Sequence, residues 1–350
     1  MTISRTALAP GYAVSRILKG GWQLAGGHGA VNRAAALDDM ARFVDAGITT
    51  FDCADIYTGV EALIGEFIRS RRTGVPIQVH TKYVPDLDTL ARVTRHDVEA
   101  AIDRSLTRLG LEQLDLVQFH WWDYTVPRFV EVAGWLDDCR RGGKIAHLGA
   151  TNFATPQLRT MLQAGIPIVS HQVQYSVLDR RPSHSMMVLC HEAGVKLLCY
   201  GGVAGGFLSD RYLDAPAPAT PLENRSLVKY RLIIDEFGGW ARFQHLLRAL
   251  RGIADRYDTS ISAVALRWVL DQPAVASVIV GARHAGHLDD LRRVEGLRLD
   301  ADDGAAITHG QAGAPGPSGE IYELERAPGG VHGSIMRYAL NAGPASGRVD

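Results

Sequence analysis

Residues 35–52 read AALDDMARFVDAGITTFD and contain, in order, a helical pattern, a glycine turn and the end of a strand. Over 35–46 the apolar side chains recur at intervals of three and four residues, which is the period of an amphipathic helix. Gly47 interrupts this pattern, and the β-branched and aromatic run TTF then leads to Asp52. The stretch therefore predicts one helix-to-strand unit whose strand ends on a carboxylate.

The same alternation of short apolar runs and longer amphipathic stretches continues through most of the chain. We predict eight strands, at Ile17–Gly20, Thr49–Asp52, Ile77–Lys82, Leu114–His120, Ile145–Ala150, Val169–Gln174, Lys196–Tyr200 and Val275–Val280. Predicted helices occupy 35–46, 97–109, 128–141, 155–164, 183–193 and 241–257. Strands with so little polar alternation are typical of parallel strands that are buried on both faces. Eight such strands, each followed by a helix, predict a (β/α)8 TIM barrel.

A doubly wound open sheet is the alternative architecture for this pattern, but its G-x-G-x-x-G fingerprint does not match Gly26-Gly27-His28-Gly29. Two segments depart from the repeat. Residues 201–240 form a long insertion after the seventh strand, where we expect a lid or binding loop. We expect residues 1–300 to form the barrel domain, and the Gly- and Pro-containing tail, 301–350, to be partly ordered and to pack on it.

The composition excludes several classes of protein. The 37 Lys and Arg residues balance 38 Asp and Glu, and 46% of the residues are hydrophobic, which excludes a disordered chain and a polybasic nucleic-acid binder. The four cysteines lack the spacing of a zinc site, so we expect no metal, free thiols and a reducing compartment. Without a long apolar run or a secretory leader pattern, we predict a cytoplasmic protein with no membrane partner.

Polar residues end three successive predicted strands. Asp52 ends the second strand, Lys82 the third and His120 the fourth, while Tyr57 lies in the loop after the second. Each of these residues alone also suits an ordinary structural role. Because the carboxyl ends of barrel strands meet at one rim, however, we expect the four side chains to form one site.

This set of side chains suits proton delivery to a carbonyl oxygen. A tyrosine phenol has an ordinary pKa of about 10, and a nearby ammonium favours its ionised form. We expect Asp52 to keep Lys82 protonated and directed at the phenol of Tyr57. We expect His120 to donate a hydrogen bond to the carbonyl oxygen and to orient it.

These residues and their surroundings resemble the aldo-keto reductase superfamily, over a region from Gly20 to about Leu291. The matching motifs are Phe51-Asp52-Cys53-Ala54-Asp55-Ile56-Tyr57 with Gly65, His80-Thr81-Lys82, and Asp115-Leu116-Val117-Gln118-Phe119-His120. The resemblance implies a (β/α)8 barrel that binds a nicotinamide cofactor without a Rossmann domain. It also implies a catalytic tetrad of Asp52, Tyr57, Lys82 and His120, in which Tyr57 is the general acid and base.

The resemblance assigns cofactor contacts as well. The segments Gly149–Phe153 and His171–Tyr175 are similar to those that bind the nicotinamide carboxamide, and Tyr200 stands where an aromatic ring stacks on the nicotinamide. The implied cofactor residues are Trp22, Asp52, Thr151, Asn152, Gln172, Tyr200, Gly201, Gly202, Val203, Gly205, Gly206, Gly281, Ala282, Arg283, His287 and Asp290.

The segment from Gly281 to Asp290 leaves the choice between NADP and NAD open. Gly281-Ala282 and His287 replace the Lys-Ser pair and the Arg that are typical of NADPH-selective members, and Asp290 replaces a usual Glu. Arg283 either supplies a fork of donors to a 2′-phosphate or faces solvent. We favour NADP narrowly over NAD.

Aromatic residues dominate the predicted substrate pocket, whose members are Trp22, Tyr57, His120, Trp121 and Trp122. Such walls suit a hydrophobic or ring-shaped substrate or a sugar face, and no cationic clamp for a carboxylate stands out. We predict an NAD(P)-dependent oxidoreductase that interconverts a small-molecule carbonyl compound and an alcohol. The alternatives are an NAD-dependent sugar or secondary-alcohol dehydrogenase of the same family and a cofactor-binding regulatory subunit.

Overall fold

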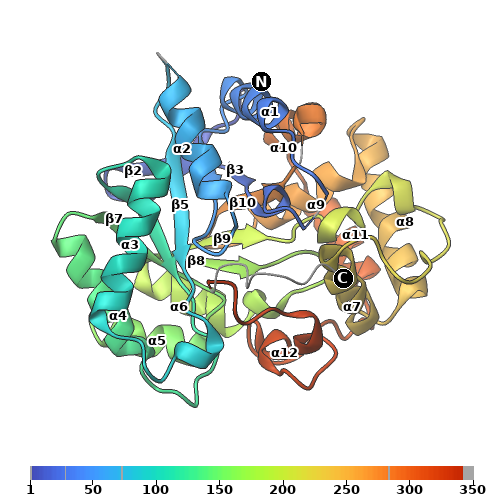
Figure 1. Cartoon of the computed structure of the whole chain (residues 1–350). Coiled ribbons are helices and arrows are strands. Elements are labelled where there is room, and N and C mark those ends of the chain that lie inside the picture. Colours follow the sequence, from blue (N-terminus) through green and yellow to red (C-terminus); the bar gives the residue numbers. More distant parts are fainter. Residues whose placement is uncertain (1, 28, 72–73, 283, 342–350) are drawn as a thin grey trace.

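Eight parallel strands close into a barrel in the computed structural model, which describes residues 2–27, 29–71, 74–282 and 284–341 (Figure 1). The barrel strands are β3 (Ile17–Gly20), β4 (Thr50–Asp52), β5 (Gln78–Tyr83), β6 (Leu114–Phe119), β7 (Ile145–Thr151), β8 (Ile168–Gln174), β9 (Lys196–Tyr200) and β10 (Val275–Gly281). They pair in chain order, and β10 pairs with β3 to close the barrel. The predicted (β/α)8 barrel is confirmed.

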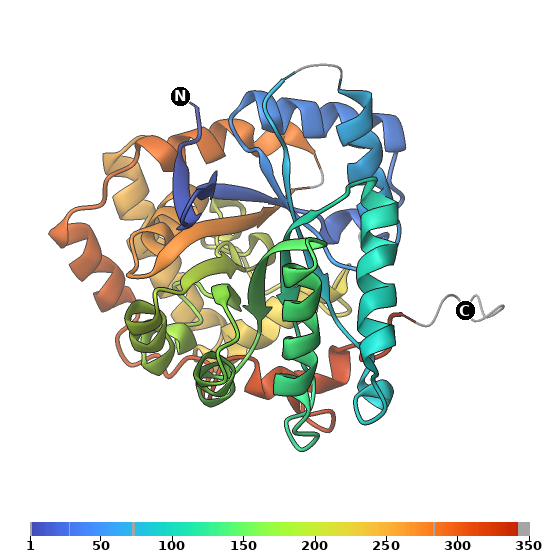
Figure 2. The same cartoon turned by 90° about the vertical axis from the view of Figure 1, so that its left-hand side faces the viewer.

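Helices surround this barrel, as the view turned by 90° shows (Figure 2). Those that follow barrel strands are α1 (Arg33–Asp45), α2 (Val60–Ser70), α3 (Arg95–Leu109), α4 (Phe129–Arg141), α5 (Thr155–Gln163), α6 (Ser185–Ala193), α9 (Ile261–Leu270) and α10 (Leu288–Gly296). Short 3-10 helices are η1 (Trp22–Leu24), η2 (Leu87–Thr89), η3 (Arg181–Ser183), η4 (Ala204–Gly206), η5 (Asp210–Tyr212), η6 (Ala285–His287) and η7 (Gly333–Ile335). None of the helices in the described part of the chain has the length and apolarity needed to cross a membrane.

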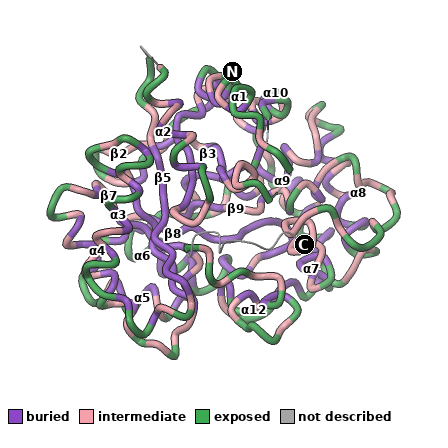
Figure 3. Tube along the Cα trace, viewed as in Figure 1, coloured by how far each residue is buried: buried purple, intermediate pink, exposed green. Residues whose placement is uncertain are grey.

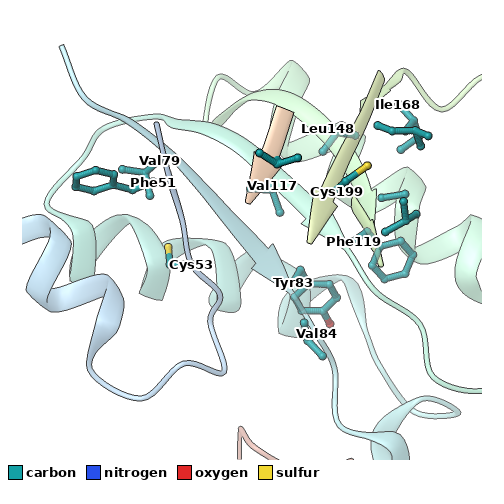
Figure 4. Packing of buried hydrophobic residues seen from close by; sticks show 14 of the residues in the cluster. Phe51, Cys53, Val79, Tyr83, Val84, Val117, Phe119, Leu148, Ile168 and Cys199 are labelled. Carbon is teal, nitrogen blue, oxygen red and sulfur yellow. The ribbon is translucent and has the colours of Figure 1, made fainter. Parts of the chain in front are cut away.

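Along each strand, successive side chains point alternately into the barrel and toward the surrounding helices. On β4, Phe51 stacks on Phe67 of α2 with a ring-centroid distance of 5.9 Å, whereas the next residue, Asp52, hydrogen-bonds side chains of other strands inside the barrel. Figure 4 shows Phe51 together with other members of this buried cluster, such as Val117 and Leu148. Burial follows the same division, because the strands are mostly buried and exposed residues lie on the outer helices and loops (Figure 3).

An antiparallel hairpin that the sequence analysis did not predict fills the amino-terminal end of the barrel. It consists of β1 (Arg5–Ala9) and β2 (Tyr12–Ser15). Leu8 and Val14 of the hairpin are buried in one cluster with Leu18, Leu116 and Leu198 from barrel strands. The Tyr12 ring lies 4.5 Å from the His147 ring, and the Tyr12 hydroxyl hydrogen-bonds His80 Nε2 at 3.0 Å. The hairpin therefore seals this end with both apolar and hydrogen-bonded contacts.

The helix that packs on β10 is α9, and α8 (Trp240–Arg256), which was predicted as 241–257, lies outside it. Most residues of α9 are buried, so its sequence ISAVALRWVL shows no clear polar face. The helical period is hidden for this reason, whereas the amphipathic α8 displays it.

The insertion and the tail both contain helices. Within 201–240, α7 (Arg225–Glu236) is capped by Asn224, whose side chain accepts a hydrogen bond from the Leu227 backbone at 3.0 Å. In the tail, α11 (Ala301–Gly310) packs against α8, and α12 (Glu323–Arg326) follows. Both segments thus have regular structure that positions side chains near the barrel mouth.

Gly65 explains how closely α2 and α3 approach each other. A Cβ atom at Gly65 would lie 2.5 Å from the Leu109 carbonyl oxygen and 2.6 Å from that of Arg108. These are backbone atoms at the end of α3, which do not move aside as a flexible side chain does. Glycine is therefore required at this position by packing.

We expect Gly65→Ala to lower the free energy of unfolding by about 1–3 kcal/mol, since the clash outweighs the gain in helix propensity of about 0.5–1 kcal/mol. The matched control is Gly134→Ala in α4, where no heavy atom lies within 4 Å of the added Cβ. That variant is expected to be neutral or slightly more stable. Thermal and denaturant midpoints of the two variants measure the difference, and equal midpoints would contradict the packing argument.

Candidate active site

A cavity of about 1110 Å³ lies at the carboxyl ends of the barrel strands. All four residues of the predicted tetrad line it, namely Asp52, Tyr57, Lys82 and His120. Its wall also includes many of the predicted cofactor contacts: Trp22, Thr151, Asn152, Gln172, Tyr200, Gly201, Gly202, Val203, Gly205, Gly206, Gly281, Ala282, His287 and Asp290. The strand ends therefore bring these side chains to one rim, as the sequence predicts.

Asp52 and Lys82 form a buried ion pair on neighbouring strands. Lys82 Nζ lies 2.8 Å from Asp52 Oδ2 and donates a second hydrogen bond, also of 2.8 Å, to the Cys53 carbonyl oxygen. Burial is the largest single effect and disfavours the ammonium, yet the attraction of Asp52, together with that of Tyr57 and the hydrogen bond to Asp52, raises the pKa of Lys82 above its ordinary value. An ammonium has three N–H donors, so one remains for another partner.

Two glutamines hold the other oxygen of the same carboxylate. Gln118 Nε2 donates to Asp52 Oδ1 at 3.0 Å, and Gln172 Nε2 donates to the same oxygen at 2.6 Å. Gln172 Nε2 also donates to Gln118 Oε1 at 2.9 Å. The sequence analysis missed Gln118 as a site residue, although it stands two positions before His120 and therefore on the same face of β6.

Tyr57 lies between an indole and the ammonium. Its ring centroid is 5.1 Å from that of Trp22 and 5.2 Å from Lys82 Nζ. Burial raises the pKa of the Tyr57 phenol above its ordinary value, and the positive charge of Lys82 opposes this rise without cancelling it. The expectation that Lys82 favours the phenolate is correct in direction, but burial is the larger effect and keeps the phenol protonated at neutral pH.

The hydrogen bonding of His120 decides which of its nitrogens carries the proton. Nδ1 lies 3.1 Å from the Thr151 carbonyl oxygen, which can only accept, so Nδ1 is the protonated nitrogen. Burial, followed by the charge of Arg326, lowers the pKa of His120 to about 3, and the imidazole is neutral. Nε2 is buried without a partner among the described residues and offers a lone pair to the cavity. In this tautomer Nε2 is an acceptor with no partner in the described part of the chain, whereas the sequence analysis expects His120 to donate a hydrogen bond.

The two tryptophans after His120 point in opposite directions. The Trp122 ring lies edge-on to His120 with centroids 4.3 Å apart and lines the cavity. Trp121 is fully buried behind the rim, where its indole N–H donates to the Val126 carbonyl at 3.0 Å and its ring packs on Phe119. The structure thus does not place Trp121 in the substrate pocket, since its indole packs behind the rim while that of Trp122 lines the cavity.

Asn152, Gln172 and Tyr200 meet where the carboxamide contacts are expected. Asn152 adopts a left-handed conformation with φ of 59°, and its Oδ1 accepts a hydrogen bond of 2.9 Å from the Tyr200 hydroxyl. Within the described residues, the amide N–H groups of Asn152 have no partner. The amide nitrogen of Gln172 is engaged inside the barrel, which leaves its oxygen as an acceptor. Together they present one donor and one acceptor, the complement of a primary carboxamide.

The glycine-rich loop after Tyr200 lies against the aromatic ring of Tyr230, a residue of α7. A Cβ at Gly201 would lie 2.7 Å from the Tyr230 hydroxyl oxygen, and one at Gly205 would lie 2.7 Å from the Tyr230 ring. Both glycines also have positive φ, of 79° and 67°. Close approach of Tyr230 therefore requires these glycines, in addition to any role in approaching a phosphate.

At the far end of the cavity, the rings of His284 and His287 stack with centroids 5.3 Å apart, and both line the wall. Asp290 forms an ion pair with Arg293 at 3.3 Å. Arg283 lies outside the described residues. His284, which the sequence analysis did not select, belongs to the same short segment as the predicted His287.

The tail contributes two residues that no sequence pattern indicated. The Tyr322 ring lies edge-on to His120 with centroids 5.6 Å apart, and it lines the cavity. Arg326 donates hydrogen bonds to the carbonyl oxygens of Trp121 and Asn152, and its guanidinium lies 4.4 Å from the Tyr124 ring centroid. The tail is therefore fastened to the ends of β6 and β7 beside the tetrad.

Comparison with known proteins agrees with this geometry. A model described as the aldo/keto reductase family matches residues 16–310. The chain is 28% identical to flagellar radial spoke protein 5 of Chlamydomonas reinhardtii, over 83% of this chain and 64% of that protein. It is 27% identical to aldo-keto reductase YhdN of Bacillus subtilis (strain 168), over 84% of this chain and 88% of that protein.

A solved structure shows the same fold. The glycerol dehydrogenase AKR11B4 from Gluconobacter oxydans superposes with a TM-score of 0.76 at 22% identity, and the match covers 91% of this chain and 97% of that one. Because the family model spans nearly the whole barrel, including every strand that carries the tetrad, the chain belongs to the aldo/keto reductase family of NAD(P)H-dependent oxidoreductases.

Proposed function

We propose that this protein interconverts a small-molecule carbonyl compound and its alcohol by hydride transfer, with Tyr57 as general acid and base. The observation that supports this most directly is that the Tyr57 phenol, the Lys82–Asp52 pair and the lone pair of His120 Nε2 all face one cavity. A reduced nicotinamide, when bound, supplies the hydride. The residues of the chain supply the proton, the binding groups and a water-excluding wall.

The cavity has groups that suit a nicotinamide dinucleotide. The free N–H of Asn152 and the free oxygen of Gln172 match the carbonyl and amino groups of a carboxamide. In the described part of the chain, the backbone N–H groups of Gly202 and Val203 make no hydrogen bond and are available to an anionic pyrophosphate. The volume of about 1110 Å³ exceeds the 300–1000 Å³ of common ligand pockets, which leaves room for a second, smaller molecule.

Proton transfer follows from the ionisation states in the site. During reduction, the protonated phenol of Tyr57 donates its proton to the carbonyl oxygen, and the third N–H of Lys82 stabilises the phenolate that forms. The new hydroxyl group then donates a hydrogen bond to Nε2 of neutral His120. During oxidation, His120 orients the alcohol in the same way, and the phenolate accepts the proton.

For the cofactor, we propose NADP ahead of NAD. Arg283 supports this choice from the sequence, because a guanidinium fork suits a phosphate. His284 and His287, which follow Arg283 in the sequence, line one end of the cavity and add imidazole donors there. Gly281 and Ala282 lack the side chains that would otherwise reinforce this choice.

Replacing Tyr57 by Phe removes the proton donor and keeps the ring against Trp22. We expect kcat for carbonyl reduction to fall by roughly 10²–10⁴-fold, with NADPH affinity unchanged in a fluorescence titration. Tyr257→Phe is the matched control, since Tyr257 bonds Asp303 far from the cavity and its loss is expected to leave kcat unchanged. Turnover of Tyr57→Phe within tenfold of the wild type would contradict the assignment.

The pH dependence is expected to report Tyr57 and not His120. Reduction requires the protonated phenol of Tyr57, whose pKa is raised. The rate of reduction therefore stays level through neutral pH and declines only above pH of about 10. Oxidation requires the phenolate and rises over that same alkaline range. Lys82→Met removes the charge that opposes the rise in the pKa of Tyr57, so the alkaline limb moves to higher pH. An inflection near pH 6.5 that disappears in His120→Asn would contradict a His120 pKa of about 3.

Comparing kcat/KM for NADPH and NADH tests the cofactor proposal. We expect NADPH to be preferred, and Arg283→Ala to reduce kcat/KM for NADPH by about tenfold or more while NADH changes little. Arg292→Ala is the matched control, because the exposed Arg292 pairs with Asp289 on α10. A preference for NADH, or an equal loss with both cofactors, would contradict the proposal.

A further inference from the structure

Four cationic side chains from outside the barrel line the same cavity as the tetrad, and one of them is Arg211 of η5. Arg225 and Lys229 come from α7, and Arg337 comes from the tail. The two segments meet at this wall, since η7 packs against α7 and Arg225 donates a hydrogen bond of 3.0 Å to the Ile335 carbonyl. The sequence analysis found no cationic clamp, because these residues come together only when the insertion and the tail dock.

Lys229 lies deepest among aromatic rings. Its Nζ atom is 5.1 Å from the ring centroid of Tyr200, 5.2 Å from that of Tyr322 and 5.9 Å from that of Tyr230. Its side chain is only 13% exposed. Aromatic faces attract a desolvated cation, so the rings hold the ammonium in place but accept no strong hydrogen bond.

The nearest carboxylate is largely committed to another cation. Lys229 Nζ lies 3.7 Å from Glu325, whereas Arg181 donates two hydrogen bonds of 3.1 and 3.3 Å to the same carboxylate. Arg181 also binds Asp179 through contacts of 2.7 and 3.0 Å. Burial lowers the pKa of Lys229 below its ordinary value, and the attraction of Glu325 does not restore it. The ammonium of Lys229 therefore has N–H donors left for a further anion.

The two arginines of α7 and the tail lack carboxylate partners. Within residues 2–341, apart from the three short stretches left undescribed, no ion pair involves Arg225 or Arg337. Burial, together with repulsion from Arg337, lowers the pKa of Arg225. Of the four acidic residues in the cavity wall, Asp52 pairs with Lys82, Asp210 with Arg251 and Asp290 with Arg293. The fourth, Glu223, is exposed to solvent, as is Arg337. This side of the cavity is consequently positive.

We infer that Lys229, flanked by Arg225 and Arg337, binds a carboxylate or phosphate group carried by the carbonyl substrate. The inference rests on the proposed function, and it names the class of substrate for the same site. Tyr322 sets the spacing, because its ring contacts His120 on one side and Lys229 on another. The anionic group is therefore separated from the reacting carbonyl by about the width of one aromatic ring.

Matched aldehydes test this inference in the full-length enzyme with NADPH. 4-Carboxybenzaldehyde is compared with benzaldehyde, and glycolaldehyde phosphate with glycolaldehyde, so that the two pairs distinguish a carboxylate from a phosphate. We expect the wild type to favour the anionic member of at least one pair. In Lys229→Met, the ratio of kcat/KM for the anionic to the neutral member is expected to fall about tenfold to a hundredfold. Lys229→Arg is expected to retain most of that ratio.

Lys144→Met is the matched control, because it removes an exposed lysine that pairs with Asp103 on the outer surface. It is expected to leave both rates unchanged. If Lys229→Met lowers both members of each pair by the same factor, Lys229 only anchors the tail and the inference is overturned. It is also overturned if the variant weakens NADPH binding while the ratio stays constant, or if the wild type favours neither anion.

A failure of the proposed function gives a different result. If the wild type reduces none of the four aldehydes with either cofactor, the carbonyl reductase assignment fails for these compounds. Calorimetric binding of 4-carboxybenzyl alcohol and benzyl alcohol then decides the inference without turnover. A tenfold weaker binding of the carboxylate by Lys229→Met supports the anion site. Equal binding by the wild type and the variant overturns it.

Discussion

The ion pair between Asp52 and Lys82 is the constraint on which the rest of the site depends. Removing two charges from water costs several kcal/mol for each ion, so such a pair persists only where further hydrogen bonds satisfy it. Gln118 and Gln172 bond one oxygen of the carboxylate, and the Cys53 carbonyl accepts a second bond from the ammonium. Because β4, β5, β6 and β8 each contribute a group, the closed barrel itself holds the ammonium beside Tyr57.

Much of the barrel and its tetrad can be predicted from the sequence because strand register determines both. A polar residue at the carboxyl end of an apolar strand must lie at the rim of the barrel, and this does not depend on the conformation of the loops. The direction of Trp121 is not determined in this way, since Trp121 lies beyond the end of β6, and it packs behind the rim although its neighbours His120 and Trp122 line the cavity. The helix α9 was missed because it is apolar on nearly every side, and the β1–β2 hairpin because its short strands give little signal before they dock on the barrel.

Other parts of the site could not be predicted from spacing. Lys229 lies in the predicted lid or binding loop, and Tyr322 and Arg326 lie in the tail that is predicted to pack on the barrel, but neither prediction places single side chains. The ionisation states of Tyr57 and His120 could not be predicted from the sequence either, because they depend on how deeply each side chain is buried. Residue types at strand ends thus indicate which chemistry is available, while the docking of α7 and the tail decides the shape and charge of the pocket around it.

Arg326 ties the tail to the carbonyl oxygens of Trp121 and Asn152, which belong to loops that follow β6 and β7. During synthesis on the ribosome, those strands emerge well before Arg326 does. The catalytic groups come from the barrel strands and the loop after β4, whereas one wall around them comes from the tail. A ligand that needs this wall therefore binds only when the tail is docked on the barrel.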